Sequence, residues 1–256
     1  MTTAGTPLAG SDRDIDLRRQ LADGCRVLAS EDMGDFIWGH VSVRASTPDT
    51  FWLKGAHMGL EEVTADDAVL LDLDGNVLAG DRPRHVEWPI HSELYRARPD
   101  IASVVHSHAF ATVAFGATEV PLEDLGHEAS RWTPPDVPRF TETSDLIDSP
   151  ERGRALAAAV GSHGGALMRH HGMVVGGPDL PTACLQAIFL EQACRLQLTV
   201  MGLGVAYQAG SPEDRQLRHD KLTKPGTYTS LWAYLTRRLA PTGGKPPTPR
   251  GQRDRR

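Results

Sequence analysis

Two short histidine-bearing segments are the parts of this chain best suited to chemistry. The segment VVHSH at residues 104–108 resembles a buried strand that runs into polar residues. Side chains two positions apart on a strand point to the same face, so His106 and His108 project together while Ser107 points away. Two imidazoles, with one more from another strand, would hold a metal and leave a coordination position open for substrate. That arrangement is typical of a catalytic metal site.

A second histidine pair offers the third imidazole. His170 and His171 precede Gly172 at the end of another apolar run. Adjacent strand residues face opposite sides of a sheet, so only one of the two can reach the same metal. The glycine permits a close approach of the backbone to a ligand. A histidine alone is more often an ordinary core or surface residue, but the two segments together favour a metal site.

An acidic residue lies ahead of the first histidine pair. Glu87 stands at the entry to an expected helix, in the segment RHVEWPIH at residues 84–91. Its carboxylate could simply cap the helix, since Pro89 suits the first turn and the helix dipole favours an anion there. It could instead be a general acid or base whose pKa is set by a nearby metal and by Trp88. The residues alone leave both interpretations open.

The elements expected around these segments alternate between helix and strand. The spacing of apolar residues predicts helices over 14–30, 88–98, 109–115, 150–160, 181–203, 212–221 and 228–239. Strands are expected at 41–44, 50–53, 68–73, 77–78, 102–106, 166–169 and 173–175, with a hairpin turn at 74–76. We therefore expect an α/β layered domain over residues 12–240 with a central mixed or antiparallel sheet. Residues 1–11 and the basic, Pro/Gly-rich tail at 241–256 are expected to be disordered.

Composition limits the class of protein. A chain of 256 residues with a net charge of −6 fits one large domain and offers no attraction to nucleic acid or to an anionic membrane surface. Cys25, Cys184 and Cys194 are scattered and form no CxxC pair, which favours a reducing compartment over a disulfide framework. No signal-peptide pattern and no apolar run of membrane-spanning length is visible. We expect a soluble, cytoplasmic protein that binds a small molecule.

In their order and spacing these segments resemble the class II aldolase and adducin family. The resemblance covers about residues 15–205 and rests on GHVSVR at 39–44, EW at 87–88 with His91, HSH at 106–108 and HG at 171–172. It implies an αβα layered fold around a largely antiparallel sheet, a homotetramer, and a divalent metal held by three histidines. On this match the metal ligands would be His106, His108 and His171, and Glu87 would be the catalytic acid or base beside the metal.

Several positions depart from the sugar-phosphate enzymes of that family. Those enzymes hold phosphate with a Gly-Asn turn, a Thr-Gly turn and a Ser-Ser pair, where this chain has His40, AH at 56–57 and HV at 85–86. Each charge-assisted hydrogen bond lost would cost about 1.5–3 kcal/mol, so a sugar phosphate is not the expected substrate. A planar anionic ring suits imidazole donors better. The candidate residues for binding it are His40, His57, Arg84, His85 and His91.

These replacements make the chain similar to the family's branch of decarboxylases that act on hydroxylated aromatic dicarboxylates such as 3,4-dihydroxyphthalate. Decarboxylation and aldol cleavage both break a carbon–carbon bond and leave electrons that a metal-bound oxygen delocalises. We expect a metal-dependent lyase, with decarboxylation in aromatic-compound catabolism preferred to aldol cleavage of a non-phosphorylated hydroxy-oxo acid. A non-catalytic, adducin-like binding module is disfavoured because the three histidines and the acid are all present. An iron-dependent oxygenase is a smaller alternative.

The sequence leaves the metal and the completion of the site open. Three neutral imidazoles accept zinc, manganese, iron or cobalt. His127 and Arg131 lie in an expected loop that could close over substrate, although an ordinary surface loop is the simpler interpretation. In the resembled family a neighbouring subunit often completes the site. The candidates for that role here are Tyr207, Tyr228 and Tyr234.

Overall fold

The computed structural model describes residues 11–133 and 136–239. Its α-helices are α1 (Asp12–Ser30), α2 (Trp88–Ala97), α3 (Phe110–Gly116), α4 (Pro150–Val160), α5 (Leu180–Gly202), α6 (Pro212–Leu222) and α7 (Pro225–Leu239). Its strands are β1 (His40–Arg44), β2 (Thr50–Lys54), β3 (Ala68–Asp72), β4 (Val77–Ala79), β5 (Ser103–Ser107), β6 (Arg139–Phe140), β7 (Gly165–Met168) and β8 (Gly172–Gly177). Short 3-10 turns lie at Leu60–Glu62, Ala65–Asp67 and Ala129–Arg131.

The strands form one eight-stranded sheet in the order β4-β3-β2-β1-β5-β8-β7-β6. Neighbouring strands are antiparallel except for β6 and β7, which are parallel. In the β1–β5 pair His40 lies opposite His106, and in the β5–β8 pair His106 lies opposite Val174. The expected α/β fold with a mainly antiparallel central sheet is confirmed, and its central strands bring the histidine segments together.

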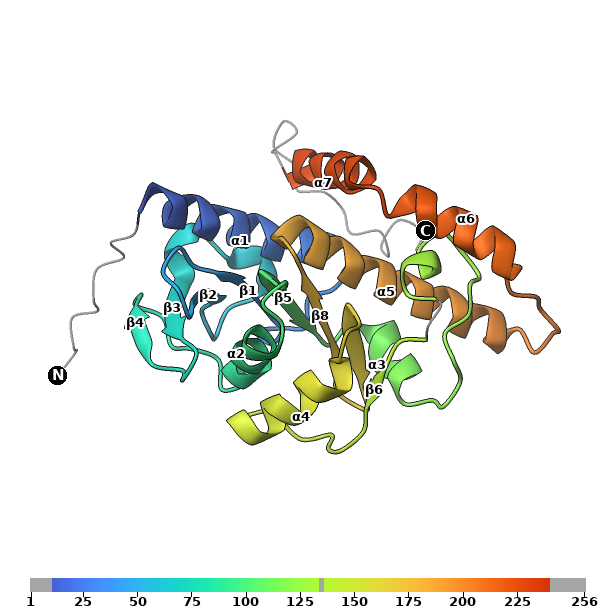
Figure 1. Cartoon of the computed structure of the whole chain (residues 1–256), viewed down its shortest axis with the longest axis horizontal. Coiled ribbons are helices and arrows are strands. Elements are labelled where there is room, and N and C mark those ends of the chain that lie inside the picture. The colour runs from blue at the N-terminus through green and yellow to red at the C-terminus, as the bar shows by residue number, and fades with distance from the viewer. Residues whose placement is uncertain (1–10, 134–135, 240–256) are drawn as a thin grey trace, which may run out of the picture.

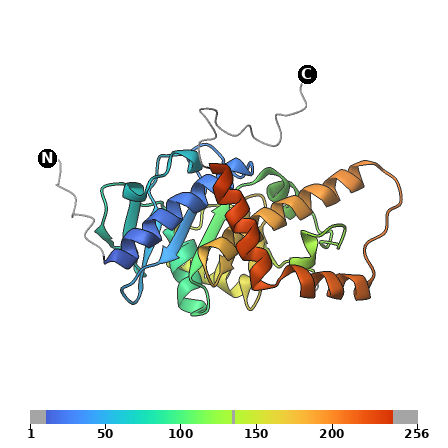
Figure 2. The same ribbon diagram turned by 90° about the horizontal axis from the view of Figure 1, so that it is seen from above.

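Helices cover both faces of this sheet. Helices α1 and α5 pack on one face and α2 and α4 on the other, with α6 and α7 outside α5 (Figure 1). Val105 and Val175 belong to the core under α1 and α5, whereas their neighbours Val104 and Val174 belong to the core under α2 and α4. Because both faces are buried, the central strands are continuous apolar runs rather than alternating ones. Figure 2 shows α7 crossing the α1 side of the molecule.

The observed elements differ from the expected ones in small ways. Strand β6 was not expected, because a strand of two residues is too short to show an alternation of apolar and polar side chains. Ser11 is not part of an unstructured end, since its hydroxyl accepts a hydrogen bond from the backbone N–H of Asp14 and caps α1. The remaining expectation of disordered termini falls outside the described residues.

Two further expectations concern the described residues as a whole. The three cysteines are free and buried. In the part of the chain that the structure describes, no helix is long and apolar enough to cross a membrane.

A glycine brings the two histidine segments together. A Cβ at Gly172 would overlap the carbonyl oxygen of Ser107, so only glycine lets β8 begin this close to the end of β5. The close approach is therefore between two strands rather than between backbone and ligand. It places His171, in the turn before β8, beside His106 and His108.

Candidate active site

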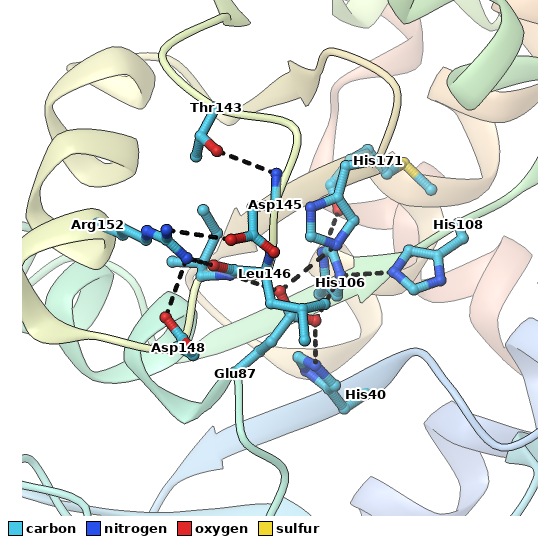
Figure 3. A network of polar contacts seen from close by, with 12 residues as sticks. His40, Glu87, His106, His108, Thr143, Asp145, Leu146, Asp148, Arg152 and His171 are labelled. Atoms are coloured by element: carbon cyan, nitrogen blue, oxygen red, sulfur yellow. Dashed lines mark hydrogen bonds and ion pairs between the residues drawn. The ribbon is translucent and has the colours of Figure 1, made fainter.

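Three histidines and one glutamate converge at the end of β5. The Nε2 atoms of His106 and His108 are 3.0 Å apart, and the ring of His171 lies 5.0 Å from that of His106, centroid to centroid. Glu87 Oε1 is 3.4 Å from His171 Nε2. These four residues offer one ligand atom each, and those atoms all lie within 4.8 Å of one another (Figure 3). Residues up to 84 positions apart in sequence thus form one cluster that could hold a metal ion.

Hydrogen bonds behind the rings leave the inner nitrogens unprotonated. His106 Nδ1 donates to the carbonyl oxygen of Met173 at 2.9 Å, and His108 Nδ1 donates to a carboxylate oxygen of Asp35 at 3.1 Å. Burial lowers the pKa of His106 and of His108, so both rings are neutral. Their Nε2 lone pairs then face each other, which is unfavourable without a cation between them. Such outer partners are typical of metal-bound histidines.

His171 completes the donor set. Its side chain is nearly buried, and neither ring nitrogen has a hydrogen-bond partner among the described residues. A buried polar group without a partner costs free energy, which a metal ion at this position would offset. His170 takes a positive φ of 58° and is exposed, so the turn directs the two neighbouring rings apart. The donor set of three imidazoles beside a carboxylate fits a divalent metal.

Glu87 occupies the N-cap position of α2, but its side chain forms no capping hydrogen bond. The carboxylate instead turns into the cluster, where Oε1 accepts a hydrogen bond from the backbone N–H of Ile147 at 2.8 Å and Oε2 lies 3.8 Å from His106 Nε2. Burial raises the pKa of Glu87, but the polar contacts with the neighbouring rings of His171 and His40 outweigh it and hold the pKa well below its ordinary value. The glutamate is therefore an ionised group facing the histidines.

A loop fastened by α4 holds Glu87 in place. Arg152 on α4 donates to the carbonyl oxygen of Leu146 at 2.6 Å and to Asp148 at 3.1 Å, and it pairs with Asp145 at 3.1 Å (Figure 3). These contacts fix the loop that presents the Ile147 N–H to Glu87. Sequence reasoning missed this loop, because its bonds join residues with no periodic pattern.

The cluster opens into a cleft of about 670 Å³, a size suited to a small molecule. Glu87, His108 and His171 lie at its base, and two of its lining side chains are aromatic and exposed: Trp38 at 55% and Phe110 at 78%. A separate cavity of about 580 Å³ is lined by residues that include Arg131 and Tyr228. Among the described residues that line the cleft there is no tyrosine.

The structure brings two of the five candidate substrate-binding residues to the cleft. His40 and His85 line it, with ring centroids 4.5 Å apart. His91 is fully buried behind His40 and bonds to it. Burial and the neighbouring Lys54 lower the pKa of His85 to about 3, so this ring lines the cleft as an uncharged imidazole.

The other two candidates do not line the cleft. His57 is exposed in a turn with a φ of 66°, which directs its side chain away from the sheet. Arg84 is also exposed, and its guanidinium lies over the ring of Trp88 at 5.2 Å from the centroid. Both lie outside the helices and strands, where the sequence pattern does not determine the direction of a side chain. The geometry gives neither a contact with the cluster.

Asp35 and Trp38 are site residues that sequence reasoning missed. They are brought together by a tight turn in which the Trp38 N–H donates to the Asp35 carbonyl at 2.9 Å. The signal available was the apolar run FIW at 36–38, which directly follows the acidic residue Asp35 and directly precedes Gly39 and His40. Apolar aromatic residues in a loop that also carries acidic residues are a mark of a binding surface.

Asp35→Asn should weaken metal binding about 10- to 100-fold, because the carboxylate that orients His108 loses its charge. Titration of the stripped protein with zinc against a chromophoric chelator measures this. Asp32→Asn is a matched control, since Asp32 lines the same cleft and its φ of 61° is one that asparagine tolerates. Equal zinc affinities in the two variants would contradict a supporting role for Asp35.

Comparison with known proteins identifies the family. The family model described as "Class II Aldolase and Adducin N-terminal domain" matches residues 19–198. This chain belongs to the class II aldolase and adducin family. The resemblance drawn from the histidine segments is thereby confirmed.

Similar proteins include a decarboxylase. The chain is 33% identical to a 3,4-dihydroxyphthalate decarboxylase of Terrabacter sp. over 215 residues, 77% of this chain and 86% of that protein. It is 27% identical to the meiotically up-regulated gene 14 protein of Schizosaccharomyces pombe, where the match covers 63% of this chain and 64% of that protein, slightly under two thirds of its length. A solved aldolase II superfamily protein from Pseudomonas syringae has a TM-score of 0.80 at 26% identity and covers 90% of this chain and 94% of its own.

Proposed function

We propose that this protein is a metal-dependent lyase that decarboxylates a hydroxylated aromatic dicarboxylate such as 3,4-dihydroxyphthalate. The observation that carries the proposal is the composition of the cleft wall, where His40, His85 and Val86 stand with Trp38 and Phe110 above the histidine cluster. Flat imidazole and indole surfaces suit an aromatic ring. The similarity to the Terrabacter decarboxylase supports the same chemistry.

The proposed metal ligands are His106, His108 and His171, and the ion would be zinc, manganese, iron or cobalt. The neutral rings of His106 and His108, and the ring nitrogens of His171 that lack a hydrogen-bond partner among the described residues, support this assignment. When bound, the metal supplies a Lewis acid that stabilises negative charge developing on a ring oxygen of the substrate.

Glu87 is the proposed general base and acid. Its ionised carboxylate takes the proton of a ring hydroxyl and delivers it to the neighbouring ring carbon that bears the leaving carboxylate, so that the hydroxyl becomes a carbonyl and Glu87 is again a carboxylate. The bond between that carbon and its carboxylate then breaks and carbon dioxide leaves. The electron pair of the broken bond restores the aromatic ring and returns negative charge to the ring oxygen. The hydrogen bond from the Ile147 N–H holds Oε1, which leaves Oε2 directed at the cluster for this transfer.

Aldol cleavage of a non-phosphorylated hydroxy-oxo acid is the alternative, and it would use the same metal ligands and Glu87. The aromatic wall favours decarboxylation, because a short aliphatic acid gains little from Trp38 and Phe110. A purely binding, adducin-like role is disfavoured by the complete donor set.

A panel of dihydroxyphthalates and hydroxy-oxo acids separates these reactions. The protein would be stripped with a chelator and reloaded with zinc, manganese, iron or cobalt, and both carbon dioxide and aldehyde would be measured. We expect metal-dependent carbon dioxide release from a dihydroxyphthalate. Aldehyde release alone would establish the aldolase reaction instead, and neither product from metal-loaded protein would contradict the substrate argument.

The proposal includes assembly and cellular context as further predictions. A homotetramer would let a tyrosine of a neighbouring copy complete the cleft, with Tyr207, Tyr228 and Tyr234 as candidates. A single catalytic domain over 12–240 and a cytoplasmic role in aromatic catabolism belong to the same prediction.

A further inference from the structure

Behind His40, buried side chains form a continuous chain of short hydrogen bonds. His40 Nδ1 lies 2.6 Å from His91 Nε2, His91 Nδ1 lies 2.6 Å from Ser42 Oγ, and Ser42 Oγ lies 2.7 Å from the Tyr95 hydroxyl. All four residues are buried. A buried network in which each polar atom has a partner orients its members strongly. The ring of His40, which lines the cleft, is therefore held from behind.

The chain arises from two elementary spacings. His40 and Ser42 are two residues apart on β1 and face the same side of the sheet. His91 and Tyr95 are four residues apart on α2 and lie on one helix face. Packing α2 against β1 interleaves the two pairs, so the four groups alternate between strand and helix.

At the Tyr95 end of this series of hydrogen bonds, one direction is favoured for the bridging hydrogens. The Tyr95 hydroxyl is buried, and Ser42 Oγ is the hydrogen-bond partner that it has among the described residues. A buried hydroxyl hydrogen without an acceptor costs free energy, so the phenol hydrogen points to Ser42 Oγ. Ser42 then directs its own hydrogen to the next group, His91 Nδ1.

At the other end of the series, where His40 lines the cleft, the same direction of the hydrogens is favoured. His40 Nε2 faces the Glu87 carboxylate, with 3.9 Å between Nε2 and Oε2. A hydrogen on Nε2 is favourable there, whereas a lone pair would place two acceptors against each other in a buried site. With that hydrogen on Nε2, His40 Nδ1 must accept from His91 Nε2. Both ends of the chain thus select the same arrangement.

We propose that Tyr95, Ser42 and His91 are positioning residues that lock His40 in the tautomer protonated at Nε2, so that His40 donates a hydrogen bond to a carboxylate that stays on the substrate ring. This deepens the proposed function and rests on it only for the identity of the substrate. The tautomer itself is a property of the free protein.

This series of hydrogen bonds holds His40 in one tautomer and does not conduct protons. If His40 gave up its Nε2 hydrogen, each link would shift by one proton and Tyr95 would become a buried phenolate. Burial raises the pKa of Tyr95 well above its ordinary value, which opposes that shift. His40 and His91 are also fully buried among other imidazole rings, an environment that disfavours a positive charge on either ring. His40 is therefore a steady neutral donor.

Nitrogen NMR of the zinc-loaded protein tests the tautomers directly, because the two nitrogens of a neutral imidazole differ widely in shift according to which one is protonated. The histidines would be labelled with nitrogen-15, and the signals assigned with His40→Asn and His91→Asn. We expect His40 and His91 each to be protonated at Nε2. A hydrogen on Nδ1 of His40 would overturn the proposal, independently of what the substrate is.

Ser42→Ala and Ser103→Ala form a matched kinetic pair. Ser103 is another fully buried serine, and its hydroxyl donates to the backbone oxygen of Ser42 at 2.7 Å without belonging to the chain. We expect Ser42→Ala to raise KM for the aromatic substrate about tenfold with a smaller change in kcat, since a carboxylate that stays on the ring is bound alike before and during reaction. Ser103→Ala should remain near the parent values. Equal effects in the two variants would overturn the role of the chain.

Discussion

His171→Ala is expected to abolish stable metal binding. Structural zinc sites bind with about 10–16 kcal/mol shared among four ligands, which assigns about 3 kcal/mol to each and at least about a hundredfold in affinity. His171 is the donor with the clearest need for an ion, because both of its buried ring nitrogens lack a hydrogen-bond partner among the described residues. Metal content after gel filtration, measured by mass spectrometry of the element, would show the loss.

His170→Asn is the matched control for that variant. His170 lines the same cleft from the adjacent position, but its φ of 58° turns the ring away from the cluster, and asparagine tolerates this backbone. The control should retain its metal. Equal retention in both variants would remove His171 from the ligand set.

Glu87→Gln is expected to keep the metal and lose turnover by about 10²- to 10⁴-fold in kcat, the range ascribed to a general acid or base. Glutamine can still accept the hydrogen bond from Ile147, so the loop keeps its anchor. It cannot take a proton from a ring hydroxyl. Steady-state kinetics together with metal content would separate lost chemistry from a lost ligand.

Glu93→Gln serves as the control for Glu87→Gln. Glu93 is also a buried glutamate of α2, but it pairs with Arg96 away from the cluster. Its variant should turn over near the parent rate. Full activity of Glu87→Gln would remove Glu87 from the mechanism, and loss of metal in that variant would make it a ligand.

The strand-borne part of the site was predictable because local periodicity determines it. A period of two placed His106 and His108 on one side of β5, and the structure has their Nε2 atoms 3.0 Å apart. The choice between His170 and His171 required the turn before β8, where a positive φ separates the rings. Residue types alone could not supply that angle.

The parts that were missed depend on loops. Asp35 and His108 are 73 positions apart in the sequence, and Ile147 and Glu87 are 60 apart. No repeating sequence pattern predicts either contact. Loops also account for His57, which was assigned to the substrate by position in a motif but lies exposed. Glu87 is an intermediate case, since its place at the start of α2 was expected and the direction of its carboxylate was not.

Carbon dioxide release from 3,4-dihydroxyphthalate, compared between chelator-stripped protein and the same protein reloaded with one divalent metal, tests the central claim most directly. We expect one equivalent of carbon dioxide per ring product from the reloaded protein and almost none from the stripped protein. Equal release with and without metal, or an intact substrate after incubation with protein shown to hold metal, would contradict it.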